Sequence, residues 1–230
     1  MNVRLLTLPS RGRLVVKQTS DPFGEAMAAA LGQLPHAGVR VVPVDRVFRR
    51  AIILPFIEGP TLQRAGAFTD ARALGHFWAF DLFIDNGDRL LKGANATNFI
   101  VGPDGVLYGI DQNIGPAPRE SAARARTVTR RRIEPLLRSA SRRELSRALF
   151  ADLRREARGA DLGDETGFCT RFELGLLANL QSLGRLCQHQ IAAALHPWQQ
   201  RPGCPWELRD LPGLPAIIEE LAASTSNILP

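Results

Sequence analysis

Three side chains with oxygen donors lie close together in the middle of the chain. Asp88 stands in the turn NGDR, Asn98 directly precedes the apolar run FIV, and Asp111 follows the apolar run VLYGI. A carboxylate held on a glycine-containing turn can accept or orient a hydroxyl proton. Because a Pro-Asp-Gly turn joins the two runs, Asn98 and Asp111 are expected at the ends of paired strands, where hard oxygen ligands suit Mg²⁺. The alternative for each residue is an Asn or Asp that only forms a turn.

Only two lysines, Lys17 and Lys92, occur among the 29 Lys and Arg residues, and Lys17 ends the apolar run LVVK. A compact ammonium suits a narrow phosphate site better than a guanidinium does. Glu25 lies in the helix-forming sequence that follows, from where it could pair with Lys17. The simpler interpretations are a surface lysine at a strand end and a glutamate that stabilises the first turn of its helix.

Phosphoryl transfer requires a cation on the nucleotide phosphates, metal ions that bridge them and a group that orients the acceptor hydroxyl. The residues above supply a candidate for each. A place for adenine is predicted in the apolar strand and glycine-containing connector ILPFIEGPTL, whose backbone could bond the edge of the base. We assign this cofactor-binding role to Leu54, Phe56, Ile57 and Glu58, although a plain strand end would have the same sequence pattern.

The elements that must position these residues begin with a small sheet and one helix. Apolar, partly β-branched runs bounded by turn residues predict four strands, at 3–8, 13–19, 39–44 and 50–55. The helix is predicted to begin at a cap on Ser20 or Asp21, with proline in its first turn, and to end at Gly32.

The remainder of the chain is expected to be mainly helical. The sequence DARALGHFWAFDLFI predicts a buried helix, because its apolar residues recur at helical spacing. A hairpin follows, with strands at 98–101 and 106–110. Pro197 and the cluster RPGCPW indicate a loop. Four further helices are predicted, at 119–138, 141–158, 168–195 and 212–224.

This order of elements predicts an α+β fold. It comprises one catalytic domain with a reduced β-rich lobe at 1–60 and a helical lobe at 61–230, which is the layout of a two-lobed protein-kinase-like fold. A generic α+β domain would share that layout, so the chemistry has to decide between them.

The motif order resembles the catalytic loop and metal-binding aspartate of the protein-kinase-like superfamily. The wording NGDR…NFIV…YGIDQN is similar to its atypical branch, the phosphoinositide 3/4-kinase-like and actin-fragmin-kinase-like enzymes. The resemblance implies ATP and Mg²⁺ as cofactors and a hinge at 54–58 that faces adenine. It further implies roles for single residues: Lys17 on the phosphates with Glu25 as its partner, Asp88 as the catalytic base beside Arg89, and Asn98 and Asp111 on the metal.

The sequence departs from that superfamily before Lys17, where no G-x-G-x-x-G loop occurs. The tip PSRGR is the only candidate for covering the phosphates, through Arg11, Arg13 and backbone amides. Nothing resembles Ala-Pro-Glu, so a regulated activation loop is not expected.

A second departure is the insertion between Asp88 and Asn98. Ordinary kinases place the asparagine five residues after the aspartate, whereas Asn98 follows at ten and Asn95 competes for the metal at seven. We prefer Asn98 because the apolar strand follows it directly. Lys92, inside the insertion, is predicted near the γ-phosphate, the alternative being a solvated lysine.

Composition and charge limit the classes of partner that we expect. The net charge is +6, and arginines are dense at 119–158 with acids interleaved, which favours i,i+4 pairs on exposed helix faces. Without aromatic interleaving we do not expect a nucleic-acid partner. An anionic surface stays open. No apolar run reaches the roughly 18 residues of a membrane span. Because the three cysteines are widely spaced, we expect reduced thiols in a cytoplasmic protein and no zinc site.

The sequence thus predicts a compact kinase that phosphorylates a protein Ser or Thr hydroxyl. A bacterial effector secreted into a host cell would fit. One alternative keeps the fold but changes the acceptor to a small molecule or a phosphoinositide. Another is an inactive pseudokinase that serves as an interaction module, which the missing glycine-rich loop favours. The sequence does not fix the oligomeric state.

Overall fold

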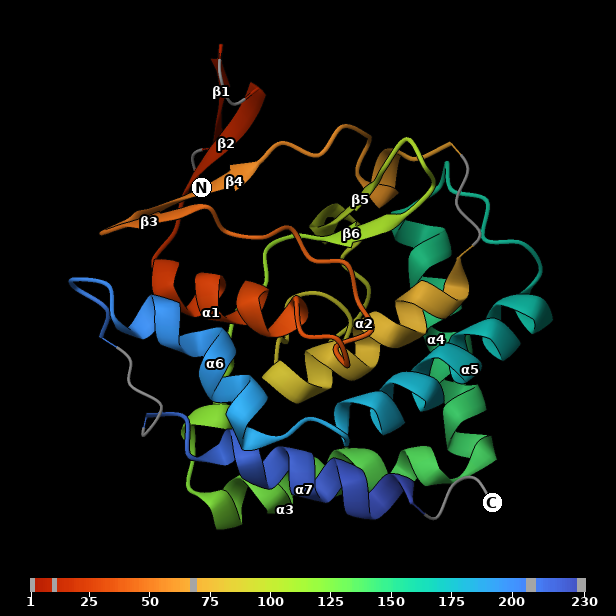
Figure 1. The fold of residues 1–230 in the computed structure, drawn as a ribbon. Helices are drawn as coiled ribbons and strands as arrows, with labels where there is room; N and C mark the ends of the chain where they lie inside the picture. Colours follow the sequence, from red (N-terminus) through yellow and green to blue (C-terminus); the bar gives the residue numbers. More distant parts are fainter. Residues whose placement is uncertain (1–2, 10–11, 67–69, 206–209, 227–230) are drawn as a thin grey trace.

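A computed structural model describes residues 3–9, 12–66, 70–205 and 210–226, and Figure 1 shows their arrangement. A small antiparallel sheet forms near the N-terminus, and helices form most of the C-terminal part. The coarse prediction of a mixed α and β chain with its sheet first is therefore confirmed.

The N-terminal sheet has the order β1-β2-β4-β3 and is antiparallel throughout. Its strands are β1 (Val3–Leu8), β2 (Gly12–Gln18), β3 (Arg46–Phe48) and β4 (Ala51–Pro55). Lys17, at the end of β2, pairs with Ile52 of β4, so its backbone lies in the middle of three strands. The β1–β2 hairpin projects from the body of the molecule (Figure 1), and β1 is exposed along its whole length.

The strand predicted at 39–44 is reduced to one bridge, and this prediction is wrong in its extent. Val41 bridges Gly109 in parallel, and Val42 N–H donates to the Gly109 carbonyl at 3.1 Å. Pro43 follows, which has no N–H to continue a ladder. The short strand β3 was not predicted, since it spans three residues.

Helix α1 (Pro22–Gly32) begins as predicted. The Asp21 carboxylate caps it by accepting from Gly24 N–H at 2.9 Å, and Pro22 occupies the first turn. Its alanine-rich surface is buried on nearly every side, because α1 lies between the sheet and α6 (Gln188–Gln199). Figure 1 shows α1 and α6 side by side.

The helical part is organised around α2 (Ala71–Ile84) and α5 (Glu165–Leu183), which pack closely together. Glycines allow this approach: a Cβ on Gly75 would lie 2.2 Å from the Phe172 carbonyl oxygen, and one on Gly175 would lie 2.1 Å from that of Arg72. The predicted helix over 70–84 is therefore confirmed, with Asp70 as its cap.

The helices after Pro118 differ from prediction at their breaks. The predicted helix 168–195 is two helices, because the chain turns after α5 at Gly184, where a Cβ would lie 3.0 Å from the Ala222 backbone. Pro197 lies inside α6 and is not part of a loop, a further correction; α6 ends at Gln199. The remaining helices are α3 (Ala122–Ile133), α4 (Ser139–Glu156) and α7 (Gly213–Thr225), with the short 3-10 helices η1 (Leu62–Arg64), η2 (Ala96–Asn98), η3 (Ala117–Arg119) and η4 (Glu134–Leu137).

The predicted hairpin is present as β5 (Phe99–Val101) and β6 (Leu107–Gly109). The connector after β4 is fastened to it, since Val101 N–H donates to the Pro60 carbonyl at 2.9 Å. Gly59 has φ +140, and a Cβ there would lie 2.0 Å from the Val101 carbonyl oxygen. A side chain is thus excluded where connector and hairpin meet.

The arginines of 119–158 pair mainly across elements, where the sequence favoured i,i+4 pairs along single helices. Arg130 of α3 makes two hydrogen bonds of 2.9 Å to Glu220 of α7, and Arg143 of α4 lies 2.7 Å from Glu173 of α5. Much of the positive charge in this region therefore fastens neighbouring helices. Within the described residues, no helix is long and apolar enough to cross a membrane.

Candidate active site

Lys17 makes two buried ionic contacts that join three distant parts of the chain. Its Nζ donates to Glu25 Oε2 of α1 at 2.5 Å and also to Asp111 Oδ1, just beyond β6. Lys17 is 5% exposed and Glu25 7%, so the ammonium is held away from water between two carboxylates. A buried charge requires such partners. The structure therefore brings together three residues that the sequence predicted to act together.

Burial governs the electrostatics of this group. It raises the pKa of Glu25 above the ordinary value of 4.5, and hydrogen bonds from Lys17 and Thr19 oppose that rise. A raised pKa at a carboxylate marks a dry site, because desolvation disfavours the charged form. Perturbed carboxylates in a cavity are common at functional sites.

Asp111 adopts a left-handed backbone conformation, with φ 59. Such a conformation is uncommon for residues other than glycine and often marks a functional position. The preceding residue, Ile110, donates its N–H to the Asn98 carbonyl at 3.0 Å. The turn after β6 is thus tied to the start of β5, so Asp111 and Asn98 are positioned by the same hairpin.

Asp88 is exposed and lies in the loop that joins α2 to the hairpin. Asn98 is 8% exposed and donates from Nδ2 to the Asp88 carbonyl at 3.2 Å, which fixes the loop against β5. The competing residue, Asn95, accepts from Thr97 N–H at 3.2 Å and so caps η2. The structure therefore brings Asn98, and not Asn95, into contact with Asp88.

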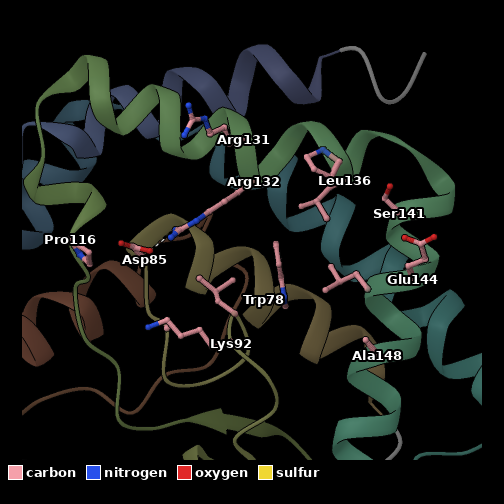
Figure 2. Close-up of a pocket in the computed structure, with 14 residues that line it drawn as sticks. Trp78, Asp85, Lys92, Pro116, Arg131, Arg132, Leu136, Ser141, Glu144 and Ala148 are labelled. Carbon is pink, nitrogen blue, oxygen red and sulfur yellow. Dashed lines mark hydrogen bonds and ion pairs between the residues drawn. The ribbon is translucent and has the colours of Figure 1, made fainter.

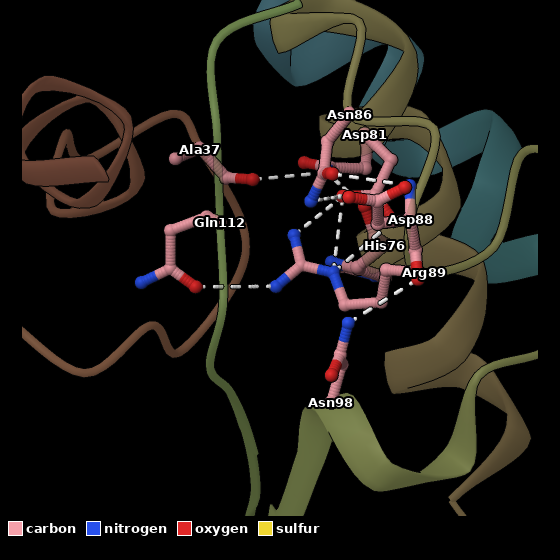
Figure 3. A network of polar contacts seen from close by, with 9 residues as sticks. Ala37, His76, Asp81, Asn86, Asp88, Arg89, Asn98 and Gln112 are labelled. Carbon is pink, nitrogen blue, oxygen red and sulfur yellow. Dashed lines mark hydrogen bonds and ion pairs between the residues drawn. The ribbon is translucent and has the colours of Figure 1, made fainter. Parts of the chain in front are cut away.

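Arg89 has a different place from the one that its predicted catalytic role requires. Its side chain is 0% exposed and forms an ion pair with the equally buried Asp81 of α2 (Figure 3). The guanidinium also lies 4.9 Å from the ring centre of Phe77 and donates to Gln112 Oε1 at 3.4 Å. A side chain enclosed in this way positions the loop that carries Asp88 and does not reach a substrate.

A polar cavity of about 510 Å³ opens beside these residues. Its walls come from the end of β2, the start of α1, the loop at Asp88 and the segment after β6. The lining residues are Lys17, Gln18, Thr19, Ser20, Glu25, Arg50, Asp88, Asp111, Gln112 and Asn113. The loop at Asp88, Lys17 and the metal-binding candidate Asp111 therefore face one common space.

Arg50 belongs to this polar cavity and was missed from the sequence. It is exposed in the turn between β3 and β4, and its carbonyl accepts from Thr19 N–H at 3.1 Å. The sequence signal for Arg50 was its position directly before β4, the strand that pairs with β2. In an arginine-rich chain, that signal does not separate Arg50 from its neighbour Arg49.

A second, apolar cavity of about 220 Å³ adjoins the polar one, and the two share Lys17 and Asp111. Of the predicted adenine-facing residues, Leu54, Phe56 and Ile57 line this cavity. Val3, Val15, Val42, Pro55, Gly59, Thr61, Ile100 and Ile110 complete the lining. Glu58 is not part of the lining, and its predicted contact with a cofactor is not reproduced here.

The predicted hinge is shaped partly by Arg13. Phe56 N–H donates to the Arg13 carbonyl at 3.0 Å, so this N–H is already engaged. The Arg13 guanidinium lies 3.9 Å from the centre of the Phe56 ring, a cation–π contact that holds the ring. Arg13 thus supports the apolar cavity, while Arg11 lies outside the described residues.

Lys92 does not join the other predicted phosphate-binding residues. It lines a separate cavity on the other side of Gly87, together with residues of α2, α3 and α4 (Figure 2). Lys92 therefore lines a different cavity from Lys17 and Asp111, and its place near a γ-phosphate stays a prediction. The sequence could not separate the two sides of the loop, because Gly87 and Asp88 are consecutive.

The donor set at the polar cavity fits magnesium. Asp111 lines the cavity and supplies a carboxylate, and Mg²⁺ is commonly held by one or two such groups together with phosphate oxygens and water. Asn98 is not among the lining residues, but its amide group contacts the backbone of Asp88, which is one of them. No group of three or more His, Cys, Asp or Glu residues within the described ranges could hold a metal alone. The ion would therefore depend on oxygen ligands that arrive with a nucleotide.

Comparison with known proteins adds no relative: no protein-family model matches this sequence, and no curated protein matches it. We therefore infer the function from the geometry of the site.

Proposed function

We propose that this chain is a Mg²⁺- and ATP-dependent kinase with a two-lobed protein-kinase-like fold of the atypical branch, and that its acceptor is a Ser or Thr hydroxyl of a protein. One observation carries the proposal. Lys17 contacts Glu25 and Asp111 where an apolar and a polar cavity meet. Phosphoryl transfer needs a cation and a metal-binding carboxylate side by side at that position.

The apolar cavity suits the adenine ring. It is lined by Val15 and Leu54 from neighbouring strands and by Ile110 from the hairpin. Ligand pockets are commonly about 300–1,000 Å³, largely apolar, with few polar groups. Together the apolar cavity of about 220 Å³ and the polar cavity of about 510 Å³ offer space in that range for a whole nucleotide.

The polar cavity suits the phosphates. Lys17 would contact them with its ammonium, and Arg50 adds a second cation from the opposite rim. Asp111 and Asn98 would hold Mg²⁺, which supplies neutralisation of phosphate charge when it is bound. Glu25 keeps Lys17 in place in that arrangement, because its contact with the lysine does not involve Asp111.

Asp88 is proposed as the group that orients and deprotonates the acceptor hydroxyl. Its exposure leaves the carboxylate open to an incoming substrate, whereas the backbone beneath it is fixed by Asn98 and by the buried Arg89. A rigid backbone with an accessible carboxylate is what a general base requires.

The decisive experiment measures transfer of radiolabelled γ-phosphate from Mg-ATP to proteins of a cell lysate. We expect labelling by the wild type and its loss in Lys17→Met and in Asp111→Asn, with circular dichroism to confirm that both variants fold. A thermal-shift measurement with Mg-ATP runs in parallel, since ligand that binds the native state raises the midpoint. Stabilisation without transfer would favour the pseudokinase. The absence of both stabilisation and transfer would refute a nucleotide site.

A further inference from the structure

The cavity that contains Lys92, which we call the loop pocket, lies outside the proposed nucleotide site. It has a volume of about 670 Å³ and is formed by α2, the loop after it, α3, η4 and α4 (Figure 2). Its lining residues are Trp78, Asp85, Gly87, Leu91, Lys92, Pro116, Arg131, Arg132, Pro135, Leu136, Ser141, Glu144, Leu145 and Ala148.

The loop pocket touches the proposed active site through one peptide bond. Gly87 lines the loop pocket, and the next residue, Asp88, lines the polar cavity. Lys92 lies directly against this point, because a Cβ on Gly87 would be 2.9 Å from Lys92 Nζ. A group bound by Lys92 would therefore be next to a hydroxyl presented to Asp88.

The charges of the loop pocket are unequal. Three cationic side chains line it, Lys92, Arg131 and Arg132, against two carboxylates, Asp85 and Glu144. Arg132 is already paired with the buried Asp85. Within the described ranges, neither Lys92 nor Arg131 forms an ion pair, so the cationic side retains charge for a bound anion.

The middle of the pocket is apolar. Trp78 of α2, Leu136 of η4, and Leu145 and Ala148 of α4 all line it. Figure 2 shows Lys92 and Asp85 at one side, Ser141 and Glu144 at the opposite side, and Trp78 between them. An occupant that fits this distribution carries an anionic group next to an apolar one.

We propose that the loop pocket binds the segment of the acceptor protein beside the phosphorylated residue, with an acidic side chain on Lys92 and an apolar side chain against Trp78. This inference rests on the proposed kinase function and adds to it a preference for acidic and apolar residues near the acceptor. A polyphosphorylated lipid headgroup fits less well, because Glu144 would repel its additional charges.

The first test measures binding without nucleotide, so that it does not depend on catalysis. The probes are two short labelled peptides in which a serine is flanked by glutamate and leucine, or by lysine and leucine. We expect the wild type to bind the glutamate peptide more tightly, and Lys92→Glu to weaken that binding about five- to tenfold while improving binding of the lysine peptide. Fluorescence polarisation reports both affinities.

Arg185→Glu is the matched control, since Arg185 is exposed at the end of α5 and lies outside the loop pocket. An equal loss in this control, or no exchange of preference in Lys92→Glu, would overturn the proposal. Because Lys92 is exposed, its substitution is expected to leave the fold intact. Trp78→Ala, checked by circular dichroism, should weaken both peptides alike.

Further outcomes distinguish the loop-pocket proposal from the proposed kinase function on which it rests. Peptide binding with charge exchange but no phosphate transfer would refute the kinase and leave the loop pocket as a peptide site. Transfer without any effect of Lys92→Glu on peptide choice would refute the pocket and leave the kinase. Competition by vesicles that contain phosphatidylinositol phosphate, lost in Lys92→Glu, would identify a lipid acceptor and overturn the peptide assignment.

Discussion

Arg89 and Asp81 form an ion pair that is entirely enclosed by protein, with both side chains 0% exposed. Asp81 belongs to α2, and Arg89 to the loop that presents Asp88, so the pair fastens the proposed catalytic loop to the central helix (Figure 3). Gly109 of β6 must lack a side chain for this to occur, because a Cβ there would lie 2.3 Å from the Arg89 NH1 atom.

Breaking this pair should unfold or greatly destabilise the protein. Asp81→Asn leaves the Arg89 guanidinium buried without a counterion, and we expect a loss of about 3–5 kcal/mol in the free energy of unfolding. Urea denaturation measures it. Asp152→Asn removes the half-buried partner of the exposed Arg155 and should change stability by less than about 1 kcal/mol. Similar losses in the two variants would contradict the structural role of the pair.

The raised pKa of Glu25 predicts a specific pH dependence. Because burial raises this pKa in the folded state, the stability contributed by Glu25 is fully present below the ordinary value of 4.5 and is lost as pH rises through the folded pKa. The difference in unfolding free energy between wild type and Glu25→Gln should therefore fall as pH increases from the acid side. Urea titrations at several pH values measure this difference.

Glu220 provides a control of opposite sign. Its hydrogen bonds from Arg130 lower its pKa, so its contribution is present above the ordinary value and is lost as pH falls through the folded pKa. The difference between wild type and Glu220→Gln should thus rise with pH. Parallel slopes for the two variants would show that the assigned burial of Glu25 is wrong.

The connector at Gly59 should tolerate no side chain. Gly59→Ala combines a strained φ of +140 with a Cβ placed 2.0 Å from the Val101 carbonyl oxygen, and we expect a loss of about 2–4 kcal/mol. Gly105→Ala, at φ +76 with no atom within 4 Å of the added Cβ, isolates the conformational strain and should cost about 1–2 kcal/mol. Thermal or urea unfolding compares the two, and an equal loss would count against the close contact.

Arg50 should contribute to nucleotide affinity. If the polar cavity holds phosphates, Arg50→Ala should weaken Mg-ATP binding about five- to tenfold, the value of one partly exposed charge-assisted contact. Arg49→Ala makes the same change one residue away, outside the cavity lining, and should leave affinity nearly unchanged. Isothermal titration calorimetry measures both, and a larger effect of Arg49 would reject the assignment.

The sequence predicted the core of the candidate site because its determinants are local. Glu25 lies eight positions after Lys17, across a strand end and a capped helix start, so their proximity follows from two short elements. Asp111 lies 94 residues from Lys17, and its contact depends on packing of the hairpin against the sheet. The resemblance of the motif order implied roles for both residues at one site, but it did not predict their direct contact.

Other features were beyond reach of the sequence for physical reasons. The sequence predicted Arg89 beside the catalytic base, whereas its burial depends on an ion pair with Asp81, a residue of the predicted buried helix to which the sequence assigned no role. The break between α5 and α6 follows from contact of Gly184 with α7, whereas the local sequence favours a continuous helix. The loop pocket is assembled from α2, α3 and α4, so no single segment carries its signature.

The bridge between Val41 and Gly109 also limits how the N-terminal sheet can move relative to the hairpin. The chain crosses from the N-terminal sheet to the hairpin at the connector near Gly59, and a second backbone attachment is made where Val42 bonds Gly109. Two separated attachments permit rotation about the line that joins them and resist twisting or sliding. If the two cavities hold a nucleotide, as proposed, its entry and release should therefore follow a single narrow opening motion, with the geometry around Lys17 largely preassembled.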